Sequence, residues 1–103
     1  MEKIENGMKI IGYEGNLPII QIKYSSQQPD RFTGIIEFVD WRGRVSEIEY
    51  YFDGLLHRED GPASIGDLGN FADYYLYSVR YSYEEYYSHP RVINKVMSSI
   101  IDL

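Results

Sequence analysis

The chain of 103 residues has no cysteine, only two histidines and no long apolar run. Without cysteine there is no disulfide framework, no thiolate nucleophile and no zinc site built on sulfur ligands. The most apolar window, residues 97–101, is far shorter than the roughly 18 residues that cross a bilayer, so no membrane contact is expected. Residues 1–10 lack the basic and then apolar pattern of a secretory signal. These absences predict a cytoplasmic protein.

The composition, with 44% apolar and 25% charged residues, is typical of one soluble globular domain. We therefore expect a single domain over residues 1–103. Within it, the sequence divides into an N-terminal hairpin and loop (1–33), a sheet of hairpins (34–81) and C-terminal helices (82–103).

Acidic residues exceed basic ones, 16 to 10, which gives a formal net charge of −6. The stretch 37–73 contains nine of the acids and only three arginines, a difference equal to the whole net charge. Such a field repels phosphates, so direct binding of nucleic acid is not expected. It would attract a basic partner, for example a protein complex that itself binds nucleic acid. The alternative is that the acidity only keeps a small domain soluble.

Short apolar segments separated by turn residues predict a β-rich fold. Residues 34–41 are apolar on both faces, which indicates a central strand, and Asp53-Gly54 is the strongest hairpin signal because two-residue turns need positive φ. The other expected strand segments are 10–11, 17–24, 45–52, 55–58, 63–65 and 71–81.

The C-terminal segment predicts two helices. Ser82 and Glu85 have the spacing of a capping box, and Pro90 suits the first turn of a second helix. This second helix carries an apolar stripe at helical spacing, made of Val92, Ile93, Val96, Met97, Ile100 and Ile101. We expect the stripe to pack on the open face of the sheet, with a dimer or partner surface as the alternative. The predicted fold is α+β: a small antiparallel sheet of about five to seven strands with a helix or helix pair on one face.

Residues 49–58 (EYYFDGLLHR) and 73–82 (DYYLYSVRYS) share an acid, two tyrosines, an apolar residue, a turn and a returning strand, 24 positions apart. A period of this size indicates stacked hairpin units. With the motif HREDGPA at residues 57–63, the chain resembles a family of tandem β-hairpin repeats, common in phages and large DNA viruses, that carry H-R-x-D-G-P-A. The resemblance covers residues 34–92 and implies a viral origin, but no shared catalytic activity.

A histidine beside carboxylates, as in His57, Glu59 and Asp60, is what general acid and base catalysis requires. Turn chemistry favours a structural corner instead, in which Asp60 accepts backbone amides while Arg58 or His57 braces it. The turn motif comprises His57, Arg58, Asp60, Gly61 and Pro62. No nucleophile elbow or phosphate loop is present, so we predict no catalytic residue, cofactor or metal.

Tyrosine is the most unusual feature: the chain has 11, of which seven lie between residues 74 and 87. Interfaces collect tyrosine because it offers a large amphipathic contact area at low entropic cost. Tyrosines that are half buried in a thin sheet are the alternative. The predicted partner-binding residues are Glu47, Glu49, Tyr51, Asp73, Tyr75, Tyr77, Tyr83, Tyr86 and Tyr87.

These features predict a non-enzymatic protein-binding module. With the resemblance, they suggest a phage protein in the host cytoplasm that binds and inhibits a host factor, as anti-CRISPR proteins do. Two alternatives remain open. One is a small enzyme or nucleotide-binding domain that uses His57 and Asp60, and the other is a structural protein that assembles with itself, for example as a homodimer.

Overall fold

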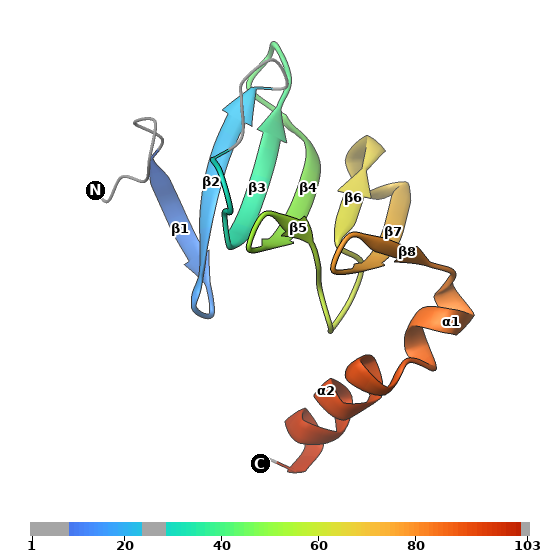
Figure 1. Ribbon diagram of the computed structural model, residues 1–103. Coiled ribbons are helices and arrows are strands. Elements are labelled where there is room, and N and C mark those ends of the chain that lie inside the picture. The colour runs from blue at the N-terminus through green and yellow to red at the C-terminus, as the bar shows by residue number, and fades with distance from the viewer. Residues whose placement is uncertain (1–8, 24–28, 102–103) are drawn as a thin grey trace.

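The computed structural model describes residues 9–23 and 29–101 (Figure 1). Eight short strands are followed by two helices in chain order. The elements are β1 (Ile10–Glu14), β2 (Leu17–Lys23), β3 (Gly34–Val39), β4 (Val45–Phe52), β5 (Leu55–Leu56), β6 (Ser64–Gly66), β7 (Phe71–Leu76), β8 (Val79–Tyr81), α1 (Tyr83–Tyr87) and α2 (Pro90–Ile101). This is the predicted α+β fold. Tyr24, the end of one predicted strand, lies outside the described residues.

The strands form one open sheet in the order β1-β2-β3-β4-β6-β7-β8, and β5 pairs with β4 beside this path. Every pair is antiparallel except β2 with β3, which run parallel. The predicted sheet was antiparallel throughout, so this pair is a correction. Residues 24–33 separate the two strands in the sequence, which is more than the two residues of a tight hairpin, and parallel strands need a long connection.

Apolar side chains fill both faces of the sheet around β3, as predicted for a central strand. One face carries a buried cluster of Ile20, Ile22, Phe32, Ile36, Phe38 and Tyr51. The other face carries a smaller cluster of Ile35, Tyr50 and Ala63. A third cluster joins the helix pair to the last hairpin and contains Leu76, Tyr86 and Val92.

The capping box at α1 is confirmed. The Glu85 backbone N–H donates to the Ser82 hydroxyl at 3.2 Å, and the Glu85 carboxylate accepts the Ser82 backbone N–H at 2.9 Å. The second helix begins at Pro90, also as predicted. Val92, which is only 1% exposed, packs in the same cluster as Tyr86.

The rest of the predicted apolar stripe on α2 is not covered, which corrects the expectation that it packs on the sheet. Ile93, Val96 and Met97 are 45%, 45% and 49% exposed. The helix packs against the rest of the molecule at its first turn, through Val92, and then runs below the strands in Figure 1. The side chains of Ile100 and Ile101 lie outside what the structure describes.

Candidate functional site

The corner formed by residues 57–63 lies where two hairpins of the sheet meet. The turn between β4 and β5 has Asp53 and Gly54 at φ 50° and 82°, and the turn between β7 and β8 has Tyr77 and Ser78 at φ 48° and 65°. Two consecutive positive φ angles are typical of the type I′ hairpin turn. The second turn adopts this geometry although it has no glycine.

Each turn is held by two hydrogen bonds to residues that precede its hairpin in the chain. We call each such pair of bonds a docking contact. In the first docking contact, the Gly54 N–H donates to the Phe32 carbonyl at 2.9 Å, and the Asp53 N–H donates to the Thr33 hydroxyl at 2.8 Å. Both donors belong to the turn, and both acceptors belong to two consecutive residues just before β3.

The second docking contact has the same arrangement, with all four residues 24 positions later. The Ser78 N–H donates to the Leu56 carbonyl at 2.7 Å, and the Tyr77 N–H donates to His57 Nδ1 at 3.0 Å. His57 therefore takes the place that Thr33 has in the first contact. The structural repeat thus begins at residues 32–33, well before the tyrosine strand from which the sequence repeat was recognised.

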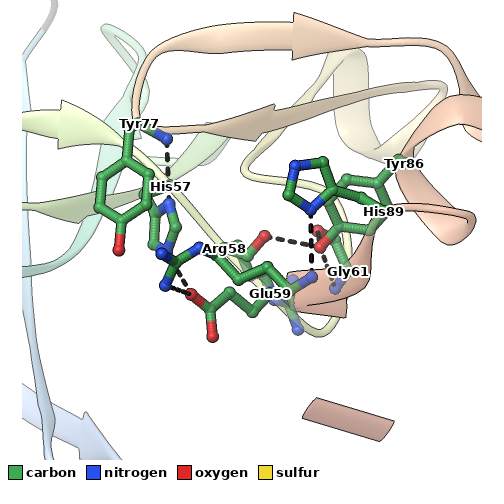
Figure 2. A network of polar contacts seen from close by, with 8 residues as sticks. His57, Arg58, Glu59, Gly61, Tyr77, Tyr86 and His89 are labelled. Carbon is green, nitrogen blue, oxygen red and sulfur yellow. Dashed lines mark hydrogen bonds and ion pairs between the residues drawn. The ribbon is translucent and has the colours of Figure 1, made fainter. Parts of the chain in front are cut away.

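His57 uses both ring nitrogens within the fold (Figure 2). Since Nδ1 accepts the Tyr77 N–H, the ring proton of the neutral imidazole lies on Nε2, which donates to the Glu59 carboxylate at 2.9 Å. The ring also stacks on Tyr77 with 4.0 Å between centroids, and the side chain is 9% exposed. A general base needs a free lone pair that faces its substrate. His57 would have to give up the docking contact to provide one.

Arg58 organises the rest of the corner. Its Nε donates to Asp60 at 2.9 Å, its Nη1 donates to the Pro62 carbonyl at 3.2 Å, and its guanidinium lies 4.0 Å from the centre of the Tyr50 ring. Arg58 thus braces Asp60 as predicted, whereas the backbone amides that Asp60 was also expected to accept are not among its partners in the described part of the chain. A side chain at Gly61, which has φ 156°, would come within 3.0 Å of the guanidinium, so this glycine permits the close approach.

Tyr86 joins α1 to the corner from inside the molecule (Figure 2). Its ring is 0% exposed, and its hydroxyl accepts the Gly61 N–H at 3.1 Å. The same hydroxyl lies 2.6 Å from the Arg58 carbonyl oxygen and 2.8 Å from that of Gly61, either of which can accept its proton. Burial raises the pKa of Tyr86 to about 12. This residue was predicted to contact a partner and is instead part of the core, because it satisfies buried backbone groups.

Tyr51 is a second correction to the predicted partner-binding set. It is buried in the core cluster of the sheet, and its hydroxyl donates to Glu49 at 2.5 Å. Partial burial and the neighbouring Glu47 carboxyl raise the pKa of Glu49 to about 7. This acid therefore carries only part of a negative charge at neutral pH.

The concentrated negative field expected from residues 37–73 is weakened by arginines, three of which come from outside the stretch. The ion pairs are Arg31–Asp53, Arg44–Asp40, Arg58–Asp60, Arg80–Asp73 and Arg91–Glu59. Asp73, a predicted partner-binding acid, is thus paired within its own hairpin at 2.9 Å. In the part of the chain that the structure describes, no three histidines or acids come together in a way that could hold a metal ion.

The remaining predicted tyrosines differ in exposure. Tyr77, Tyr83 and Tyr87 are exposed, whereas Tyr75 is partly buried against the Ile35 cluster. Tyr83 and Tyr87 lie in contact on α1, with 4.8 Å between ring centroids, and both rings meet Tyr74 edge-on. These three rings form a small aromatic ridge beside the last hairpin.

A cleft of about 490 Å³ opens beside the corner, between the ends of the central strands and α2. Its walls combine the aromatic rings of Tyr50, Phe52 and Tyr77 with charged groups of the corner and with Lys95 of α2. Sequence reasoning missed this cleft, because it brings together residues from both ends of the chain. Its polar groups are mostly those that already hold the corner together.

No family model matches the chain, and neither a curated protein nor a solved structure matches it. Among the described residues, no helix has the length and apolar character that crossing a bilayer requires.

Proposed function

We propose that this chain is a non-enzymatic protein-binding module whose contact region is the helix-pair surface. We define this surface by Tyr83 and Tyr87 of α1 and by Ile93, Val96 and Met97 of α2. The observation that carries the proposal is the exposure of the α2 stripe, where three large apolar side chains are each almost half open to solvent.

The arrangement of α2 explains why these side chains favour a partner. Val92 and Lys95 lie toward the molecule, Val92 in the core cluster and Lys95 in the wall of the cleft. At 100° per residue, Val96, Ile93 and Met97 lie about 40°, 100° and 140° around the helix from Val92, on the flank of the stripe that turns away from Lys95. Contiguous apolar groups that stay in water cost free energy, and such groups on small soluble domains mark interaction sites.

The tyrosine ridge adds to this surface. Tyr83 is 64% exposed, and its contact with Tyr87 orders both rings in advance. Rings that are already fixed lose little entropy on binding, which is one reason why tyrosine is enriched at interfaces. The exposed part of the predicted tyrosine set thus remains in the proposal, whereas Tyr51 and Tyr86 do not.

The narrower prediction, a phage protein that inhibits a host factor, stays a prediction. It rests on the resemblance of the His57 motif and on the net charge of −6. The internal ion pairs of the acidic stretch reduce the support that charge alone gives to a strongly basic partner.

Self-assembly is the second candidate, because the same uncovered stripe could pair with that of a second copy. The two candidates differ in mass. A module for another protein is a monomer when purified, whereas self-assembly produces a dimer that light scattering detects.

Affinity capture with matched variants tests the proposal. Val96→Glu places a charge within the stripe, and Ser98→Glu places the same charge about 200° away on the same helix. We expect the wild type and Ser98→Glu to retain one protein from a bacterial extract in near-stoichiometric amount, and Val96→Glu to lose it. Equal retention by both variants, or retention of nothing, would contradict the proposal. A dimer that only Val96→Glu dissociates would favour self-assembly.

A further inference from the structure

The turn between β3 and β4 carries the chain's single tryptophan, Trp41, at the end of the sheet opposite the helix pair (Figure 1). Trp41 is 84% exposed, more than any other large apolar side chain that the structure describes. Tryptophan gains the most from burial and is usually covered, so a ring this exposed is unusual on a small soluble domain.

The turn that presents Trp41 is rigid. The Asp40 carboxylate accepts the backbone N–H of Arg42 at 2.9 Å and that of Arg44 at 3.0 Å. Backbone bonds close the same turn from Asp40 N–H to the Arg44 carbonyl and from Gly43 N–H to the Asp40 carbonyl, both at 2.9 Å. The hydrogen bonds from the Arg42 and Arg44 N–H groups to the carboxylate, chiefly that from Arg44, lower the pKa of Asp40. The carboxylate therefore stays ionised and keeps the turn closed. Trp41 thus projects from a backbone that is ordered before any partner arrives.

The charge at this tip is opposite to that of the whole molecule. Arg42 places its guanidinium 4.6 Å from the Trp41 ring centre, and Arg44 pairs with Asp40 at 3.3 Å. Two arginines against one aspartate leave the tip positive, while the chain as a whole carries −6. Tryptophan and arginine are also the residues most enriched among those that dominate binding energies at protein interfaces.

We propose that Trp41 and Arg42 form a second protein-binding element, which inserts the indole into an apolar pocket bordered by carboxylates on a partner protein. The indole is 84% exposed at the end of a turn, so it suits a concave site, and the positive charge of the tip complements an acidic border. The negative charge of the remaining molecule disfavours a nucleic acid, since stacking platforms for bases need a basic surface around the ring. This inference rests on the proposed protein-binding function and adds a contact at the other end of the sheet.

Four immobilised chains test this inference on the same bacterial extract: the wild type, Trp41→Ala, Arg42→Glu and Phe71→Ala. Phe71 is 64% exposed on β7 and serves as the control for loss of an exposed aromatic ring. The retained protein is then purified and titrated against each chain. Trp41 is the only tryptophan of the chain, so its burial is followed as a shift of its fluorescence emission to shorter wavelength. Tryptophans of the partner are replaced, or Trp41 is labelled, so that only the emission of Trp41 is observed.

We expect Trp41→Ala to weaken binding at least about 30-fold, the effect of removing a dominant interface residue, and Phe71→Ala to change it little. Arg42→Glu should also weaken binding, and more so at low salt. The unfolding midpoint of Trp41→Ala should equal that of the wild type, because the ring is exposed.

Three results would overturn the inference. If Trp41→Ala binds as tightly as the wild type while Val96→Glu does not bind, the helix-pair surface is the contact and the proposed function stands without this second element. If the wild type retains no protein, the proposed function fails together with the inference. If Trp41 emission shifts with a single-stranded oligonucleotide or with vesicles that contain phosphatidylserine, and not with the retained protein, the partner is of another class.

Discussion

The two docking contacts have the same backbone geometry and different side-chain acceptors. Thr33 accepts the Asp53 N–H through a hydroxyl, and His57 accepts the Tyr77 N–H through an imidazole. Within the described residues, the Thr33 hydroxyl makes no second hydrogen bond, whereas the imidazole also bonds to Glu59, which in turn binds Arg91 of α2 at 3.3 Å. The comparison teaches that the repeat needs only an acceptor at this position, and that histidine adds a link between the hairpin and the helix pair.

This comparison bears on how the HREDGPA motif is interpreted. A histidine next to two acids has the composition of a catalytic site, but Thr33 occupies the equivalent position and has no such neighbours. The shared role is therefore acceptance of a turn N–H, and the carboxylate of Glu59 fixes which nitrogen of His57 carries the proton.

The largest expected effect concerns Tyr86, which has no counterpart at the first docking contact. Tyr86→Phe keeps the ring in the core and removes the hydroxyl, so the buried Gly61 N–H and the Arg58 carbonyl lose their partner. We expect the free energy of unfolding to fall by about 3 kcal/mol. Chemical denaturation measures it, and Tyr83→Phe on the exposed side of α1 serves as the control. A loss as small as that of the control would show that water replaces the hydroxyl.

A smaller effect is expected at His57, and it tests the equivalence of the two contacts directly. His57→Ala should cost about 2 kcal/mol, because it removes an acceptor and a stacked ring from a nearly buried position. Thr33→Ala should cost about 1 kcal/mol, since it removes an acceptor at an exposed position and no stacked ring. His57→Thr should be more stable than His57→Ala, because threonine at this position supplies the acceptor that Thr33 supplies. Denaturation curves of the three variants measure these free energies of unfolding. Equal losses of stability for His57→Thr and His57→Ala would refute the equivalence of the two docking contacts.

The smallest effect is a dependence on pH that comes from Glu49 on β4. The pKa of Glu49 rises to about 7 in the folded chain from an ordinary 4.5, so the folded state holds the proton more tightly than the unfolded state does. The bound proton therefore stabilises the folded state. This stabilisation is fully present below pH 4.5, and the free energy of unfolding decreases as the pH rises from 4.5 to 7. Glu49→Gln should remove the decrease and be more stable at pH 8 by about 1 kcal/mol, a figure reduced for partial exposure.

Glu37→Gln on the neighbouring strand β3 is the control for this pH profile, since it makes the same chemical change in a carboxyl that accepts a hydrogen bond from Gln21. This substitution should leave the slope of the free energy of unfolding against pH, between pH 4.5 and 7, as it is in the wild type. If Glu49→Gln also keeps that slope, the half-buried acid does not hold its proton.

Local signals in the sequence predicted much of this fold. Asp53-Gly54 and the Ser82–Glu85 capping box each act within a few residues, so their geometry follows from their side chains alone. The turn at Tyr77 and Ser78 has no such signal in itself. Its positive φ angles are supported by the bonds to Leu56 and His57, which only the folded chain supplies.

The candidate site was less predictable, because its residues meet through tertiary packing. The cluster of tyrosines was visible in the sequence, but nothing local distinguishes Tyr86, which is buried, from Tyr87, which is exposed. The α2 stripe was recognised by its spacing, yet its exposure depends on where the helix leaves the sheet. Trp41 was simply the end of a strand segment until the structure placed it at a rigid turn.

The protonation of His57 tests most directly whether the corner is structural. Nitrogen NMR of the imidazole at neutral pH should find Nδ1 without a proton and Nε2 with one, together with a coupling across the hydrogen bond from the Tyr77 N–H to Nδ1. A ring protonated at Nδ1, or one whose tautomers exchange freely, would contradict the account and leave His57 available for proton transfer.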